Sequence, residues 1–177
     1  MELELLICAT TNKFLMDQYR AKRMSSESIK KIGDYWKNKG RPQVIEFQYD
    51  QATQRDMVVL NQRTFQFHGA GANNLLQVNA MLHGWKENAR EMAIRTFCMP
   101  DTVIQKQLHD TYKLLELFGA PVTTYLALRE VHRDFHRYVQ KSGYEKEKID
   151  AIRQANGVER FGKSSNSRNE RVLSNVS

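Results

Sequence analysis

Residues 114–128 restrict the possible folds of this chain more than any other stretch. They read LLELFGAPVTTYLAL, fifteen positions with a single charged side chain, Glu116. Each large apolar side chain that folding buries contributes about 1.5–3 kcal/mol, so we expect this run to be hidden from water. Apolar residues at helical spacing precede and follow Gly119-Ala120-Pro121. Residues 100–138 are therefore predicted to form two helices that meet at an apolar elbow and organise the rest of the chain.

Glycine and proline are scarce, with nine and three copies among 177 residues. β-Sandwiches use these residues in their many turns, whereas long helices with short joints need few of them. The chain is also long enough to bury a sizeable core. We predict an all-α fold, a single-domain bundle of five or six helices over residues 1–142. A short charged helix over 143–155 and a disordered tail over 156–177 should follow it.

Most of the expected helices have recognisable start or stop signals. Apolar residues recur at spacings of three and four, and side chains that cap helices precede several of these stretches. The pattern predicts helices over residues 2–23, from Ser25 or Ser26 to Asn38, from Asn73 or Asn74 to Arg95, from Asp101 to Phe118, and from Pro121 to Ser142.

Residues 43–67 admit two interpretations. Ile45, Phe47 and Tyr49 alternate with polar residues, as in a half-buried strand, and in this interpretation residues 64–67 are the second strand of a short β-hairpin. Residues 50–57 contain no turn signal and are good helix formers. We favour a helix over 43–61 followed by an extended stretch over 63–67, with the hairpin as the alternative.

The clearest amphipathic pattern lies in residues 74–95, where large apolar residues keep near-ideal helical spacing. The two helices of the elbow contribute further apolar positions. The predicted core residues are Leu75, Val78, Leu82, Trp85, Leu108, Leu115, Phe118 and Tyr125. On the helix that follows the elbow, Val122 and Leu126 are also expected to point inward.

The two cysteines, Cys8 and Cys98, do not form a disulfide framework, and each lies in an apolar pattern. Glu2 and Glu4 interrupt the first apolar residues, which argues against a signal peptide. No apolar run approaches the length of about 20 residues that spans a bilayer. We expect an intracellular protein, in the nucleus rather than the cytoplasm, with no membrane partner.

No group of residues predicts catalysis. His132 and His136 are four residues apart, a spacing that suits two metal ligands, but Arg133 and Arg137 would repel a cation. His109 lies next to Asp110, as a catalytic base would, but the sequence offers no nucleophile paired with His109. Glu116 is a lone carboxylate that should point outward from its helix. We predict no catalytic, cofactor-binding or metal-binding residue and no enzymatic activity; an enzyme or metal protein centred on the three histidines is the weakest of the hypotheses.

The net charge of +7 is concentrated in residues 13–41, which contain nine Lys or Arg against three acids. Tyr35 and Trp36 lie among these cations. Phosphate-neutralising cations beside aromatic rings are typical of nucleic-acid-binding surfaces. Residues that would contact nucleic acid or an acidic partner there are Arg20, Lys22, Arg23, Lys30, Lys31, Lys37, Lys39 and Arg41.

Two stretches resemble a helical domain of uncharacterised proteins from filamentous fungi. They are GRPQVIEFQYDQATQRD, residues 40–56, and RTFCMPDTVIQKQLHDTYKLLELFGAP, residues 95–121. With the first helix, the resemblance covers residues 1–140. It implies an interaction or regulatory domain and carries no activity, cofactor or site residue. It also implies that the chain is part of a longer protein.

The sequence thus favours a non-enzymatic protein-interaction or oligomerisation domain of a regulatory protein, which binds another protein or itself. The alternative is a nucleic-acid-binding domain that uses the basic face of residues 13–41. A third class, an enzyme or metal protein, would need a deep polar pocket. A large exposed apolar surface would support the first hypothesis, and a continuous basic face would support the second.

Overall fold

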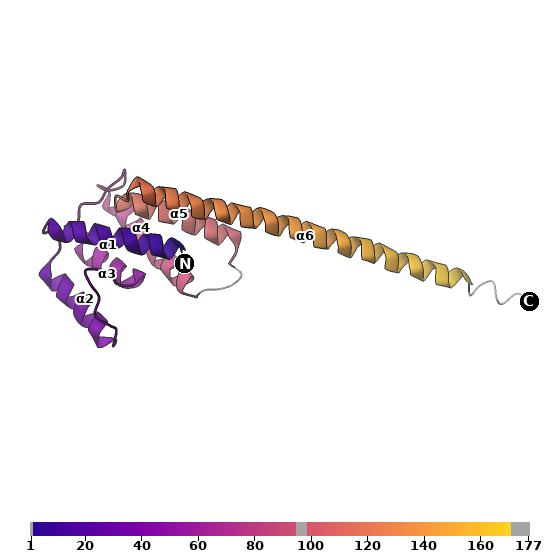
Figure 1. The fold of residues 1–177 in the computed structure, drawn as a ribbon, viewed down its shortest axis with the longest axis horizontal. Coiled ribbons are helices and arrows are strands. Elements are labelled where there is room, and N and C mark those ends of the chain that lie inside the picture. The colour runs from indigo at the N-terminus through magenta and orange to yellow at the C-terminus, as the bar shows by residue number, and fades with distance from the viewer. Residues whose placement is uncertain (1, 95–98, 171–177) are drawn as a thin grey trace, which may run out of the picture. The chain divides into compact units, whose positions relative to one another are not determined.

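The computed structural model describes residues 2–94 and 99–170 of the chain, with side chains described as far as residue 152. These residues form helices and no strand (Figure 1), which confirms the predicted all-α helical bundle and excludes the hairpin interpretation of 43–67. The helices are α1 (Glu2–Arg20), α2 (Ser26–Asn38), α3 (Gln51–Asn61), α4 (Leu75–Ile94), α5 (Asp101–Leu117) and α6 (Val122–Glu170).

The chain divides into two compact units, Met1–His132 and Arg133–Ser177. The first unit contains α1 to α5 and the beginning of α6, and the second contains the remainder of α6. The division therefore lies inside one helix, before the predicted boundary at residue 142.

Helix α6 is continuous from Val122 to Glu170, so the predicted break at Ser142-Gly143 and the separate helix over 143–155 were wrong. The disordered tail is corrected for residues 156–170, which are helical, while 171–177 lie outside the described residues. A single glycine inside a helix costs only about 1 kcal/mol relative to alanine. The Lys and Glu residues that follow are good helix formers, and together they outweigh this cost.

No described helix is long and apolar enough to cross a membrane.

Side-chain caps determine where α2, α3 and α4 begin. The Ser25 hydroxyl accepts from the backbone N–H of Ser28, and Asn74 accepts from the second and third residues of α4. The Asp50 carboxylate accepts from the N–H of Thr53 at 2.8 Å and pairs with Arg41. Because Asp50 is the cap, α3 begins at Gln51, which corrects the predicted start at 43.

Two left-handed residues end α1 and α5. Lys22 and Gly119 have φ of 58° and 65°, and the residues that follow them donate back to Gln18 and Leu115. This arrangement is the Schellman motif, in which glycine is the usual left-handed residue. Gly119 was a visible stop signal, whereas a lysine in this role was not. The sequence pattern therefore placed the end of α1 at 23 instead of Arg20.

The extended residues 65–68 are held by the buried side chain of Gln18 on α1. Its amide donates to the carbonyl of Gln66 at 3.2 Å, and its oxygen accepts from the N–H of Gln66 at 3.0 Å and from Arg23. Gln18 thus satisfies a backbone segment as a neighbouring strand would. For this reason the segment can be extended without a sheet.

Replacing Gln18 with leucine should lower the free energy of unfolding by about 1–3 kcal/mol, because the partly buried backbone N–H and carbonyl of Gln66 lose their partners. Chemical denaturation measures this change. Gln66→Ala is the matched control: the side chain of Gln66 is exposed, so the change should stay within about 0.5 kcal/mol. Equal effects of the two substitutions would contradict the assigned role of Gln18.

Aromatic side chains fill the centre of the first unit. Phe14, which is 2% exposed, lies 4.7 Å from Phe118, 5.5 Å from Phe65 and 5.6 Å from Phe67 between ring centroids. Trp85 contacts Phe118 and donates its indole N–H to a buried amide oxygen of α3 at 2.7 Å. These contacts join α1, α4, α5 and the extended segment in one core.

Most of the predicted core residues are indeed buried, namely Val78, Leu82, Trp85, Leu108, Leu115 and Phe118. Tyr125 is half-buried. Leu75 was predicted wrongly, since half of its surface is exposed. It is the first residue of α4, and its helical spacing is correct, but the packed face of the helix starts one turn later, at Val78.

Candidate functional site

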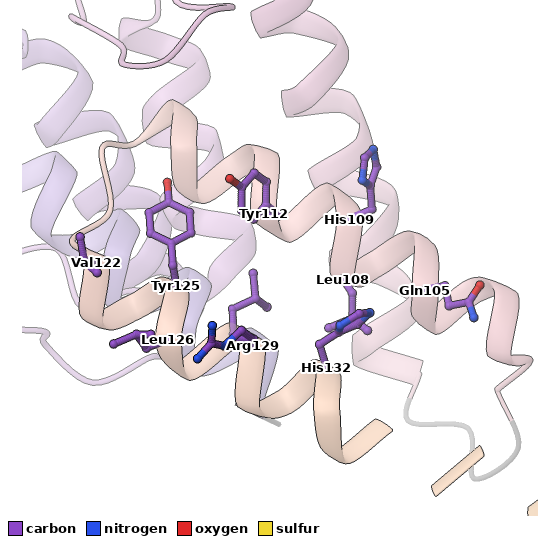
Figure 2. Close-up of a pocket in the computed structure, with 10 residues that line it drawn as sticks. Gln105, Leu108, His109, Tyr112, Val122, Tyr125, Leu126, Arg129 and His132 are labelled. Carbon is purple, nitrogen blue, oxygen red and sulfur yellow. The ribbon is translucent and has the colours of Figure 1, made fainter. Parts of the chain in front are cut away.

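A groove lies between α5 and the beginning of α6 in the first unit, with a volume of about 430 Å³. Figure 2 shows side chains from both helices around it. Its lining residues are Gln105, Leu108, His109, Tyr112, Val122, Tyr125, Leu126, Leu128, Arg129 and His132.

The spacing of these residues explains how the groove is built. On α5 they recur at intervals of three and four between Gln105 and Tyr112, and on α6 they do so between Val122 and His132. Residues at these intervals share one face of a helix. Gly119 turns the chain between the two helices, so that their faces approach each other.

The floor of the groove is buried and its edges are exposed. Leu108 and Leu128 are 5% and 6% exposed, whereas Val122 and Leu126 are 74% and 48% exposed. The prediction that Val122 and Leu126 point inward was therefore wrong. The beginning of α6 packs inward through Leu128 and leaves Val122 and Leu126 uncovered. These two side chains form the apolar wall of the groove.

Two tyrosines face each other across the opening. The rings of Tyr112 on α5 and Tyr125 on α6 are 5.4 Å apart between centroids, and Figure 2 shows them as neighbours. Burial, then the neighbouring Tyr112 and Glu116, raise the pKa of Tyr125 above its ordinary value. The phenol of Tyr125 therefore stays protonated at neutral pH and can donate a hydrogen bond.

The polar part of the lining consists of cations and neutral groups. Arg129, His109 and His132 line the groove, and no Asp or Glu is among its described lining residues. Glu116 is half-buried instead of pointing freely outward as predicted. Its side chain lies against Gly69, where an added Cβ would be 2.7 Å from the Cγ of Glu116. The groove thus combines apolar walls with an excess of positive charge.

Of the three histidines considered from the sequence, His109 and His132 line the groove. His136 belongs to the second unit and contacts Phe135. Among the described residues there is no group of three or more side chains that could hold a metal ion.

Asp110, which follows His109, takes part in a contact between α4 and α5. Its carboxylate accepts from Lys106 at 2.6 Å and from Asn88 at 2.9 Å. Burial alone would raise the pKa of Asp110, but these two hydrogen bonds and the nearby positive charges lower it. The carboxylate is therefore engaged in joining the two helices.

The loop that contains Gly69-Ala70-Gly71 has a structural contact with the end of α5. The N–H of His68 donates to the carbonyl of Leu117 at 2.9 Å, and the imidazole of His68 lies over Gly119. A Cβ at position 119 would be 2.7 Å from this ring. The small residues let the loop approach the helix end closely.

Cys8 on α1 is half-buried. Burial, followed by the charges of Glu4 and Asp50, raises the pKa of its thiol to about 11. The thiolate is the reactive form of cysteine, and the raised pKa keeps Cys8 almost entirely in the thiol form at neutral pH. Cys98 lies outside the described residues.

Four of the predicted basic contact residues interact within the protein. Arg20 is 3.7 Å from Asp17, and Arg23 donates to Gln18 at 2.7 Å. Lys39 lies 4.6 Å above the ring of Tyr35, and Arg41 lies 4.4 Å above Trp36 while it also pairs with Asp50. The aromatic rings of this region thus stack with cations of the same chain.

The remaining predicted residues, Lys22, Lys30, Lys31 and Lys37, are exposed. On α2 the first two lysines of the helix share a shallow hollow with Glu27 and Asp34. The positive surface is therefore interrupted by acids. Binding of nucleic acid to residues 13–41 stays a prediction, and this mixture of charges does not favour it.

Comparison of the chain with protein-family models, with curated proteins and with solved structures found no match. The groove residues Gln105, Tyr112, Val122, Leu126 and Arg129 were not predicted as a site. Their signal is present in the sequence as apolar residues at helical spacing on both sides of Gly119. The same spacing is also produced by a face that is fully buried.

Proposed function

We propose that this protein is a non-enzymatic interaction domain that binds a segment of another protein in the groove between α5 and α6. The observation that supports the proposal most directly is the exposure of Val122 and Leu126 beside a buried floor. An apolar face that folding leaves uncovered is typical of protein-interaction sites, particularly when polar residues surround it.

The composition of the groove agrees with this proposal. Interaction surfaces are enriched in Tyr and Arg, and the residues that contribute most to binding lie around a well-packed centre. Tyr112, Tyr125 and Arg129 have these identities and surround the floor made by Leu108 and Leu128. The exposed lysines of α2 lie beside acids instead, so the groove is the better supported of the two surfaces.

Leu126→Glu should strongly weaken partner binding without unfolding the protein, because the side chain is half exposed. Loss of one important apolar contact costs about 2 kcal/mol or more, roughly a 30-fold weakening. The measurement compares the proteins that cross-link to tagged wild-type and variant chains in the native extract, quantified by mass spectrometry. A partner captured by the wild type should be depleted in the Leu126→Glu sample.

Leu76→Glu is the matched control, because it places the same charge at an apolar residue that is 79% exposed and lies outside the groove. It should retain the partner. Light scattering of both variants shows whether the partner is a second copy of the chain. Recovery of the same partners by the wild type and the Leu126→Glu variant would refute the groove as the interaction site.

A further inference from the structure

We propose that the natural occupant of the α5–α6 groove is an acidic amphipathic helix of a partner protein. This inference rests on the proposed function and adds the shape and charge of the bound segment. It is carried by the facing helical surfaces, the shape of the apolar floor and the charges of the lining residues.

The shape of the groove suits one face of a helix. The lining residues of α5 extend from Gln105 to Tyr112, which corresponds to about two helical turns or 10 Å. A helix that lies along them presents apolar side chains at intervals of three and four to Leu108 and Leu128 on the floor. Addition of a peptide strand needs an exposed sheet edge, and the described residues contain no strand that could supply one.

The volume of the groove is also appropriate for side chains of this kind. Its 430 Å³ lies in the range of about 300–1,000 Å³ that is usual for ligand pockets. Release of water from between the exposed Val122 and Leu126 and a matching apolar face favours binding. The rings of Tyr112 and Tyr125 contribute flat apolar surface at a small cost in conformational entropy.

The charges of the lining select an acidic partner. Arg129 and the phenol of Tyr125 are one helical turn apart on the same face of α6, where Figure 2 shows both side chains. A guanidinium binds a carboxylate through two parallel hydrogen bonds, and a protonated phenol can donate a third. The described lining contains no Asp or Glu; the carboxylate of Glu116, outside the lining, acts on the Tyr125 phenol, which leaves Arg129 as the main group that recognises an acid.

The same charges argue against a second copy of this chain as the occupant. The chain has a formal net charge of +7, and two such molecules repel each other. An acidic segment of a different protein is attracted both by the whole chain and by Arg129. Complementary charge of this kind accelerates association and excludes partners of the wrong sign.

Two synthetic helices test the inference. Both peptides have about 16 residues, enough for measurable helicity, carry leucines at positions i, i+3, i+4 and i+7, and bear a fluorescent label. One has glutamates beside the leucines and the other has lysines. In anisotropy titrations with the full chain, the glutamate peptide should bind at least about tenfold more tightly at low salt. The difference should shrink as salt screens the charges.

Arg129→Glu should remove or reverse the preference, whereas Lys30→Glu, the same change of charge on α2 and outside the groove, should retain it. Equal binding of the two peptides, an equal loss in both variants, or failure of the glutamate peptide to bind would overturn the inference. So would a dimer that Leu126→Glu dissociates. In each of these cases the cross-linking comparison still decides independently whether the groove binds a protein.

Discussion

Replacing Leu115 with aspartate should leave the chain unable to fold. Leu115 lies in the last turn of α5, on the face that packs inward, and its side chain is 0% exposed. An unpaired carboxylate at this position must either lose its hydration or become protonated, and either process costs several kcal/mol. The whole free energy of unfolding of a domain is about 5–15 kcal/mol. Loss of the leucine contacts adds a further penalty of about 2–5 kcal/mol.

Circular dichroism during heating measures this effect. The Leu115→Asp variant should show no cooperative transition, whereas Leu115→Ala should fold with a lowered melting temperature. Leu76→Asp serves as the control, because Leu76 lies in the first turn of α4 and is 79% exposed. A carboxylate there is also favoured by the helix dipole. A cooperative melt of Leu115→Asp close to that of the wild type would show that the α5 face is not buried.

Replacing Phe14 with alanine should lower the free energy of unfolding by about 3–5 kcal/mol, the range for a large buried aromatic residue. The ring of Phe14 is in contact with Phe65, Phe67 and Phe118, and each such pair contributes about 0.5–1.5 kcal/mol beyond burial. Its removal also leaves a cavity at the point where α1, the extended segment and the end of α5 meet. The cavity cannot close without moving all three.

Urea denaturation measures this change, with Leu5→Ala as the matched control. Leu5 is on the same helix and is 69% exposed, so its replacement should change the free energy of unfolding by less than about 0.5 kcal/mol. The aromatic cluster would not be the centre of the core if Phe14→Ala destabilised the protein no more than Leu5→Ala.

Local features of the sequence were sufficient for the helical architecture. The periodicity of residues 74–95 and the cap at Ser25 act through neighbours within one or two turns, and the structure has α4 and α2 at these places. Where a local signal was unusual, the prediction failed. The left-handed Lys22 ended α1 early, and Asp50 delayed the start of α3. Gly143 did not interrupt α6, because one weak residue does not outweigh many good helix formers.

Contacts between residues that are far apart in the sequence could not be predicted from local patterns. Gln18 was part of an ordinary helix in the sequence, and only the fold brings it to the backbone of Gln66, 48 residues away. The basic residues 13–41 formed one cluster along the chain. The structure pairs Arg23 and Arg41 with side chains of the protein itself and places Lys30 and Lys31 beside two acids of α2. Charge counting along a sequence does not include these pairings.

The apolar residues 114–128 illustrate both what the sequence determined and what only the tertiary structure determined. Their sequence alone determined two helices and a turn at Gly119, because helix propensity, apolar spacing and a left-handed glycine are properties of neighbouring residues. Only the tertiary structure decided that Leu115 is enclosed while Val122 and Leu126 are left at the surface. Burial depends on which elements cover a face, and no element of the first unit covers this side of α6 among the residues that the structure describes. The groove, and with it the proposed function, arises from that uncovered face.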